Sequence, residues 1–205
     1  DHKDRAIFVT TFASHLVRIG EVIKIAKKMK REVLILGRSM GRYIQAAEDL
    51  RLVKYSANSR IKTYRNQIKA TLKDVEHNRG KYIVICTGNQ AEPNSVLDRI
   101  TKGEFHFKFK ERDSVVFSCR TIPTTETIER RSIMERELKK RNVHVWTDVH
   151  VSGHSSKEDL KDFIHLSPSH GDQRMEKALE KQTIAHKLIK PENIHVMKDG
   201  DFLKI

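Results

Sequence analysis

The stretch His150-Val-Ser-Gly-His-Ser-Ser156 lies between an apolar run at residues 143–149 and a helical pattern that begins at Lys157. A short apolar run, a turn and then a helix predict a strand-turn-helix unit, which is a building block of parallel sheets. The turn places a histidine and two hydroxyl groups where free backbone N–H groups and the positive end of the helix dipole favour a phosphate. Taken alone, a serine before a helix is an ordinary cap, so the rest of the chain decides its meaning.

Short apolar runs and helical patterns alternate along the chain. Strands are predicted at residues 6–9, 33–36, 82–86, 115–117 and 143–149, where apolar residues stand at consecutive positions. Such runs suit strands that helices cover on both faces. Helices are predicted around residues 16–26, capped by Ser14, and at 43–50, 61–75, 95–100, 128–138 and 160–164. The alternation predicts an α/β fold with a doubly wound, mostly parallel sheet flanked by helices.

Polar blocks follow the predicted strands at residues 10–15, 37–40, 87–93, 118–123 and 152–155. Ligands of doubly wound sheets bind at the carboxyl ends of the strands, so these blocks predict one shared site. The alternative is that they are ordinary loops, rich in Gly, Ser and Thr because helices need caps.

The charge balance indicates a polyanionic partner. The 205 residues include 40 Lys and Arg against 27 Asp and Glu, which gives a formal net charge of +13. Such an excess favours nucleic acid, through neutralisation of phosphates and release of counterions. The alternative is a basic surface that serves solubility alone.

Other classes of protein find little support. No apolar segment is long enough to span a bilayer and residues 1–12 lack the layout of a signal peptide, so a cytoplasmic setting is expected. The two cysteines, Cys86 and Cys119, are expected to be buried and reduced. Neither a Gly-x-Ser-x-Gly elbow nor a Gly-x-Gly-x-x-Gly turn is present, which argues against a serine hydrolase and a dinucleotide fold.

Five blocks together carry a resemblance to a known family. They are Val9-Thr-Thr-Phe-Ala-Ser-His15, Gly37-Arg-Ser-Met40, Cys86-Thr-Gly-Asn-Gln-Ala-Glu-Pro93, Phe117-Ser-Cys-Arg-Thr-Ile-Pro123, and residues 148–155 followed by 168–171. In this order they resemble the β-CASP branch of the metallo-β-lactamase nucleases, and within it ribonuclease J, especially its archaeal form. The resemblance extends over most of residues 6–171.

The resemblance implies a zinc-dependent ribonuclease that hydrolyses phosphodiesters of single-stranded RNA as a 5′–3′ exonuclease and endonuclease. By this resemblance His154 is the second β-CASP motif, contacts the scissile phosphate and assists proton transfer, while His170 is the third motif and a zinc ligand. The residues expected to bind RNA or phosphate are Ser152, Gly153, Ser155, Arg38, Ser39 and Arg120. For Arg38 the alternative is a surface salt bridge.

Two departures from the family shape the expected organisation. The metal-binding half, with its His-x-His-x-Asp-His run, lies N-terminal to this region in the family, and no such run occurs here. Residues 1–166 are therefore expected to form the β-CASP domain, and residues 167–205 a returning C-terminal strip of the metallo-β-lactamase domain. The second departure is that Leu166 is followed at once by Ser167, where the family has a helix end, a loop and a strand.

The expected partners are single-stranded RNA and the absent metal-binding half, and a homodimer stays open. A catalytic zinc needs at least three protein ligands, so this chain alone is expected to hold little zinc and to be inactive. The rival hypothesis is a non-catalytic module that binds RNA or phosphate, supported by the missing metal-binding run.

Overall fold

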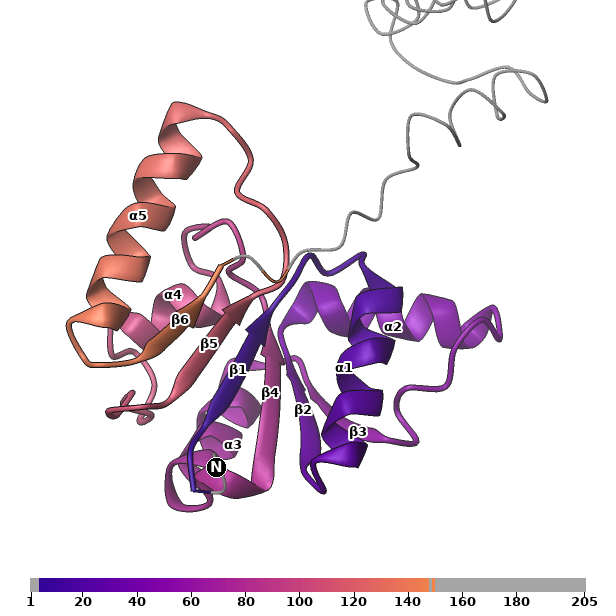
Figure 1. Cartoon of the computed structure of the whole chain (residues 1–205). Coiled ribbons are helices and arrows are strands. Elements are labelled where there is room, and N and C mark those ends of the chain that lie inside the picture. Colours follow the sequence, from indigo (N-terminus) through magenta and orange to yellow (C-terminus); the bar gives the residue numbers. More distant parts are fainter. Residues whose placement is uncertain (1–3, 148, 150–205) are drawn as a thin grey trace, which may run out of the picture. The chain divides into compact units, whose positions relative to one another are not determined.

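The computed structural model describes residues 4–147 and 149, which belong to the first of two compact units, Asp1–Val151. In this part of the chain six strands form one parallel sheet in the order β3-β2-β4-β1-β5-β6 (Figure 1). The strands are β1 (Ile7–Thr10), β2 (Glu32–Leu36), β3 (Ser59–Lys62), β4 (Tyr82–Cys86), β5 (Ser114–Phe117) and β6 (His144–Trp146). The predicted α/β class and parallel sheet are confirmed. The predicted boundary between residues 166 and 167 lies outside the described residues.

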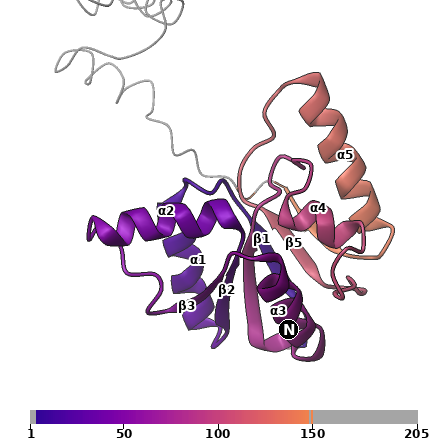
Figure 2. The ribbon, with the colours of Figure 1, turned by 180° about the vertical axis from the view of Figure 1, so that it is seen from behind.

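Helices cover both faces of the sheet. They are α1 (Leu16–Lys28), α2 (Arg38–Asp49), α3 (Arg65–His77), α4 (Val96–Thr101) and α5 (Thr125–Lys139), with a 3₁₀ turn η1 (Arg79–Lys81) before β4. Buried side chains of α1 and α2 share one core cluster, and those of α3, α4 and α5 share another. Figures 1 and 2, seen from opposite sides, show α1 and α3 on different sides of the sheet.

The central strand β4 contributes to both clusters. Ile83 and Ile85 pack with α1 and α2, whereas Tyr82, Val84 and Cys86 pack with α3, α4 and α5. Successive side chains of a strand point to opposite faces, so a run of consecutive apolar residues is what two buried faces require. Both cysteines of the chain are buried and free, as expected. Burial raises the pKa of the Cys86 thiol well above its ordinary value, so it stays protonated.

Several local predictions were wrong. Residues 61–75 were expected to be helical throughout, yet β3 occupies Ser59–Lys62 and α3 begins only at Arg65. β3 is an edge strand whose residues are partly exposed, so it shows no continuous apolar run.

His15, and not Ser14, is the N-cap of α1, because a turn at Phe12 delays the start of the helix. β6 ends at Trp146, short of the predicted 149.

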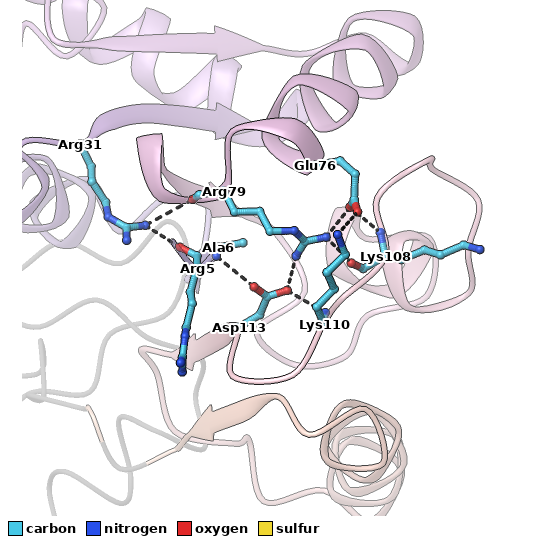
Figure 3. Close-up of polar contacts among 8 residues, drawn as sticks. All are labelled: Arg5, Ala6, Arg31, Glu76, Arg79, Lys108, Lys110 and Asp113. Carbon is cyan, nitrogen blue, oxygen red and sulfur yellow. Dashed lines mark hydrogen bonds and ion pairs between the residues drawn. The ribbon is translucent and has the colours of Figure 1, made fainter. Parts of the chain in front are cut away.

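A buried ionic network joins segments at the amino ends of the strands (Figure 3). The carboxylate of Asp113, just before β5, accepts hydrogen bonds from the backbone N–H of Ala6 at 3.0 Å and of Lys110 at 2.8 Å. The guanidinium of Arg79 pairs with Asp113 and also with Glu76 at the end of α3. The network therefore fixes the starts of β1, β4 and β5 relative to one another.

Candidate nucleic-acid interface

A cavity of about 990 Å³ opens at the carboxyl ends of β1, β2, β3 and β4. Its wall is formed by residues that follow each of these four strands, which confirms that several polar blocks meet at one edge of the sheet. The connections leaving β1 and β4, two adjacent strands, pack on opposite faces, so this edge is a topological switch point. Such points are where doubly wound sheets bind ligands.

The connection between β2 and α2 is a single residue, Gly37, with φ of 137°. A Cβ on Gly37 would lie 3.3 Å from Cγ2 of Thr87, so both the backbone angle and the neighbouring loop favour glycine here. Arg38 and Ser39 are consequently the first two residues of α2, and both are exposed in the cavity wall. No side chain caps this end of α2, where free N–H groups and the helix dipole favour an anion.

Four arginines line the cavity, against one carboxylate, Glu92. Arg38 and Arg42 lie one turn apart on α2, and neither makes an ion pair within the described part of the chain. The surface salt bridge considered for Arg38 is therefore absent among residues 4–147 and 149. Arg65 and Arg99 both contact the carboxylate of Glu104, at 3.5 and 2.8 Å. The wall is thus strongly cationic, as phosphate binding requires.

A buried amide network fixes the loops behind the cavity. Asn89, which is fully buried, accepts hydrogen bonds through Oδ1 from Thr10 Oγ1 at 3.2 Å and from the N–H of Cys119 at 3.3 Å. Its Nδ2 donates to the carbonyl of Cys119 at 3.2 Å. Gln90 donates through Nε2 to the carbonyl of Arg120 at 2.8 Å and accepts from the N–H of Ile122 at 2.9 Å. The loops after β1, β4 and β5 are therefore joined.

Arg131 of α5 contacts the same network through Asn89. It is 3% exposed and donates a hydrogen bond to the carbonyl of Asn89, while its guanidinium lies 3.3 Å from the centroid of the Phe117 ring. Burial lowers its pKa, and the carboxylate of Glu135 at 2.8 Å opposes that shift. A buried, stacked guanidinium on a backbone carbonyl orients the loop and is not available to a ligand.

Unlike Arg38 and Ser39, Arg120 is not among the described residues that line the cavity. Arg120 is exposed beyond β5, whereas the cavity wall in the described part of the chain draws on the segments after β1 to β4. Ser152, Gly153, His154, Ser155 and His170 lie outside the described residues. Their proximity to the cavity stays a prediction.

Sequence reasoning missed further residues of the wall. Arg42 stands four positions after Arg38, a spacing that places both on one helix face and could have been noticed. Tyr64 and Arg65 come two and three positions after the end of β3, and they were missed because that strand was taken for part of a helix.

Among residues 4–147 and 149, no group of three His, Cys, Asp or Glu side chains could hold a metal ion. In the same part of the chain, no helix has the length and apolar character that crossing a bilayer requires.

The chain is similar to a known family domain and to several known proteins. The family model described as "Ribonuclease J, beta-CASP domain" matches residues 3–135. The protein named Ribonuclease J from Methanocaldococcus jannaschii is 36% identical over 99% of this chain and 47% of its own length. Ribonuclease J from Pyrococcus abyssi is 38% identical over 82% of this chain and 38% of its own length. The chain thus spans less than half the length of either relative.

Proposed function

Because this chain belongs to the β-CASP domain family of ribonuclease J, as its sequence blocks predicted, we propose that it is the RNA-gripping part of a zinc-dependent ribonuclease. The longer protein would hydrolyse phosphodiester bonds of single-stranded RNA by 5′–3′ exonuclease and endonuclease action. The observation that carries this proposal is the cavity at the carboxyl ends of β1 to β4, with four arginines against one carboxylate.

Roles follow for the residues of this chain. Arg38 and Ser39 would hold a phosphate of the RNA at the start of α2, and Arg120 would contact the backbone beyond β5. Ser152, Ser155 and the backbone of Gly153 would hold the scissile phosphate. His154 would assist proton transfer to the leaving oxygen, a task that a histidine performs near neutral pH.

Zinc is proposed for the longer protein, with His170 as the ligand that this chain supplies. If zinc is held there in the longer protein, it would supply an activated water for attack on a phosphodiester. The described residues do not fit a zinc site by themselves, because no three suitable side chains lie together among them and a catalytic zinc needs three protein ligands. The arginines that line the cavity supply positive charge without a metal, so RNA binding there would not require zinc.

The test is the salt dependence of RNA affinity, measured by fluorescence anisotropy with a labelled single-stranded RNA. Each phosphate contact contributes a slope of about 0.7 to the plot of log affinity against log salt for single strands. Arg38→Ala should weaken binding to all RNA sequences and reduce the slope by about that amount. The matched control is Arg136→Ala, an exposed arginine on α5 outside the cavity wall. Equal slopes for the two variants would remove Arg38 from the interface.

A second candidate function is a non-catalytic RNA-binding module. The sequence favours it in one respect, since none of the 205 residues forms a His-x-His-x-Asp-His run. The discriminating measurement is RNA cleavage by the longer protein, with zinc content determined on the same sample. Tight RNA binding without cleavage in a zinc-loaded protein would favour the module.

A further inference from the structure

Two exposed tyrosines face the same cavity as the arginines. Tyr43 of α2 is 50% exposed, and Tyr64, the residue before α3, is 65% exposed. Single exposed aromatic residues are common on protein surfaces. Here two tyrosines line the same cavity, although they come from segments that follow different strands.

The backbone of α2 approaches the Thr63 side chain closely, which brings these segments together. A Cβ on Gly41 of α2 would lie only 2.4 Å from Cγ2 of Thr63, the residue after β3. Only glycine therefore allows α2 to pack this tightly against the end of β3. Tyr43 and Tyr64 follow Gly41 and Thr63 closely in sequence, and both line the cavity.

An arginine adjoins each tyrosine in sequence. Arg42 is exposed, makes no ion pair within residues 4–147 and 149, and lies one helical turn from Arg38. Two like charges at this spacing destabilise a helix by a few tenths of a kcal/mol, roughly 0.2–0.5. The pair does not stabilise the helix, and both guanidinium groups lie in the cavity wall, where they can contact a ligand. Arg65 lies beside Tyr64 and is held by Glu104 at 3.5 Å.

Flat aromatic rings beside cationic groups suit a nucleotide. A base stacks on an aromatic ring with about 1–3 kcal/mol per base, and a guanidinium binds the adjoining phosphate. An acidic peptide would use the arginines but leave the rings in water. The volume of about 990 Å³ is sufficient for a nucleotide unit, since ligand cavities typically measure roughly 300–1,000 Å³.

We propose that the cavity is a base-stacking subsite for single-stranded RNA, in which Tyr43 and Tyr64 stack bases and Arg42 binds the phosphate between them. This inference rests on the proposed function and deepens it, because it adds recognition of the bases to binding of the RNA sugar-phosphate backbone. Stacking of this kind accepts every base, so little sequence preference is expected.

The experiment compares a short oligoadenylate with an abasic oligomer of the same length and charge, using anisotropy with the present chain. The unmodified chain should bind the oligoadenylate more tightly by about 5- to 150-fold for each base that stacks. Tyr43→Ala and Tyr64→Ala should lower affinity for the oligoadenylate by a similar factor and leave the abasic oligomer unaffected. The phenylalanine variants should keep the preference, because they keep the ring.

Arg42→Ala should weaken both oligomers equally and reduce the salt slope, whereas Arg136→Ala should change neither. Equal affinity for the two oligomers, with a steep salt dependence, would overturn the stacking subsite. It would leave the proposed binding of the RNA backbone intact. Binding of adenosine monophosphate without binding of either oligomer would assign the cavity to a free nucleotide and refute the RNA subsite. Failure of every RNA probe to bind would overturn the proposed function itself.

Discussion

Replacing Asp113 by alanine should destabilise the described unit by about 3–5 kcal/mol, because it removes one partner of a buried ion pair. The side chains of Asp113 and Arg79 are 2% and 9% exposed, so water does not replace the lost carboxylate. The backbone N–H groups of Ala6 and Lys110 also lose their acceptor, at about 1–3 kcal/mol for each one that stays unsatisfied.

Other contacts of Arg79 keep the effect from being larger. Its guanidinium retains Glu76, donates to the carbonyl of Lys108 at 2.7 Å and lies 4.7 Å from the centroid of the Phe107 ring. A loss of about 3–5 kcal/mol is nevertheless a large part of the roughly 5–15 kcal/mol that stabilises a typical domain. Asp113→Asn keeps a hydrogen-bond acceptor and should lose less, which separates the charge from the hydrogen bonds.

The assay is urea unfolding followed by the fluorescence of Trp146, the single tryptophan of the chain, which pairs with Val116 of β5. The free energy of unfolding is obtained by linear extrapolation to zero urea. The control is Glu21→Ala, which removes an ion pair with Lys24 at the surface and should leave the midpoint nearly unchanged. A midpoint for Asp113→Ala no lower than that of the control would refute the reasoning.

Three further predictions concern backbone strain, pH and catalysis. Gly88→Ala should lower stability by more than about 1 kcal/mol in thermal unfolding, because φ is +120° and the new Cβ would lie 2.7 Å from Cβ of Leu97. Burial raises the pKa of Glu76, but hydrogen bonds from its cationic and backbone neighbours outweigh burial and hold the pKa below its ordinary 4.5. The stability from this carboxylate is therefore complete above pH 4.5 and lost as the pH falls below it, so Glu76→Gln should flatten the acid limb of a stability curve. In the longer protein, His154→Ala should retain its metal and cleave about 10²- to 10⁴-fold more slowly, whereas His170→Ala should lose metal as well.

Each of these three predictions has an outcome that would contradict it. An unchanged melting temperature for Gly88→Ala would show that the loop after β4 relaxes without cost. An acid limb of unchanged steepness in Glu76→Gln would assign acid sensitivity to other carboxylates. Normal cleavage by His154→Ala with metal in place would show that the motif does not act as it does in the family.

Much of the fold could be predicted because most strands are buried on both faces. The run Tyr82–Cys86 supplies side chains to two cores, and that requirement is visible as consecutive apolar residues. β3 was not predicted, because an edge strand with partly exposed residues needs no run of consecutive apolar residues. The N-cap of α1 was predicted wrongly, because a backbone turn at Phe12, and not a side-chain oxygen, determines where that helix begins.

The candidate site could be located from sequence but not assembled. Arg38 and Ser39 were assigned correctly to a strand end, since polar residues after a buried strand must lie at the edge of the sheet. The contacts of Gln90 with Arg120 and Ile122 join residues about thirty positions apart through side-chain amides. No local pattern encodes such contacts, because they depend on how two loops meet after the sheet has formed.

The amide network also bears on the thermodynamics of binding. Asn89 and Gln90 hold neighbouring loops in place, so a ligand does not have to order them, and little backbone entropy is lost. Side chains remain to be ordered, at about 0.5–1.5 kcal/mol each. Glu104 already restrains two of the cavity arginines, whereas Arg38 and Arg42 have no such restraint among the described residues. Among the cavity arginines, the entropic cost of RNA binding should therefore fall mainly on Arg38 and Arg42.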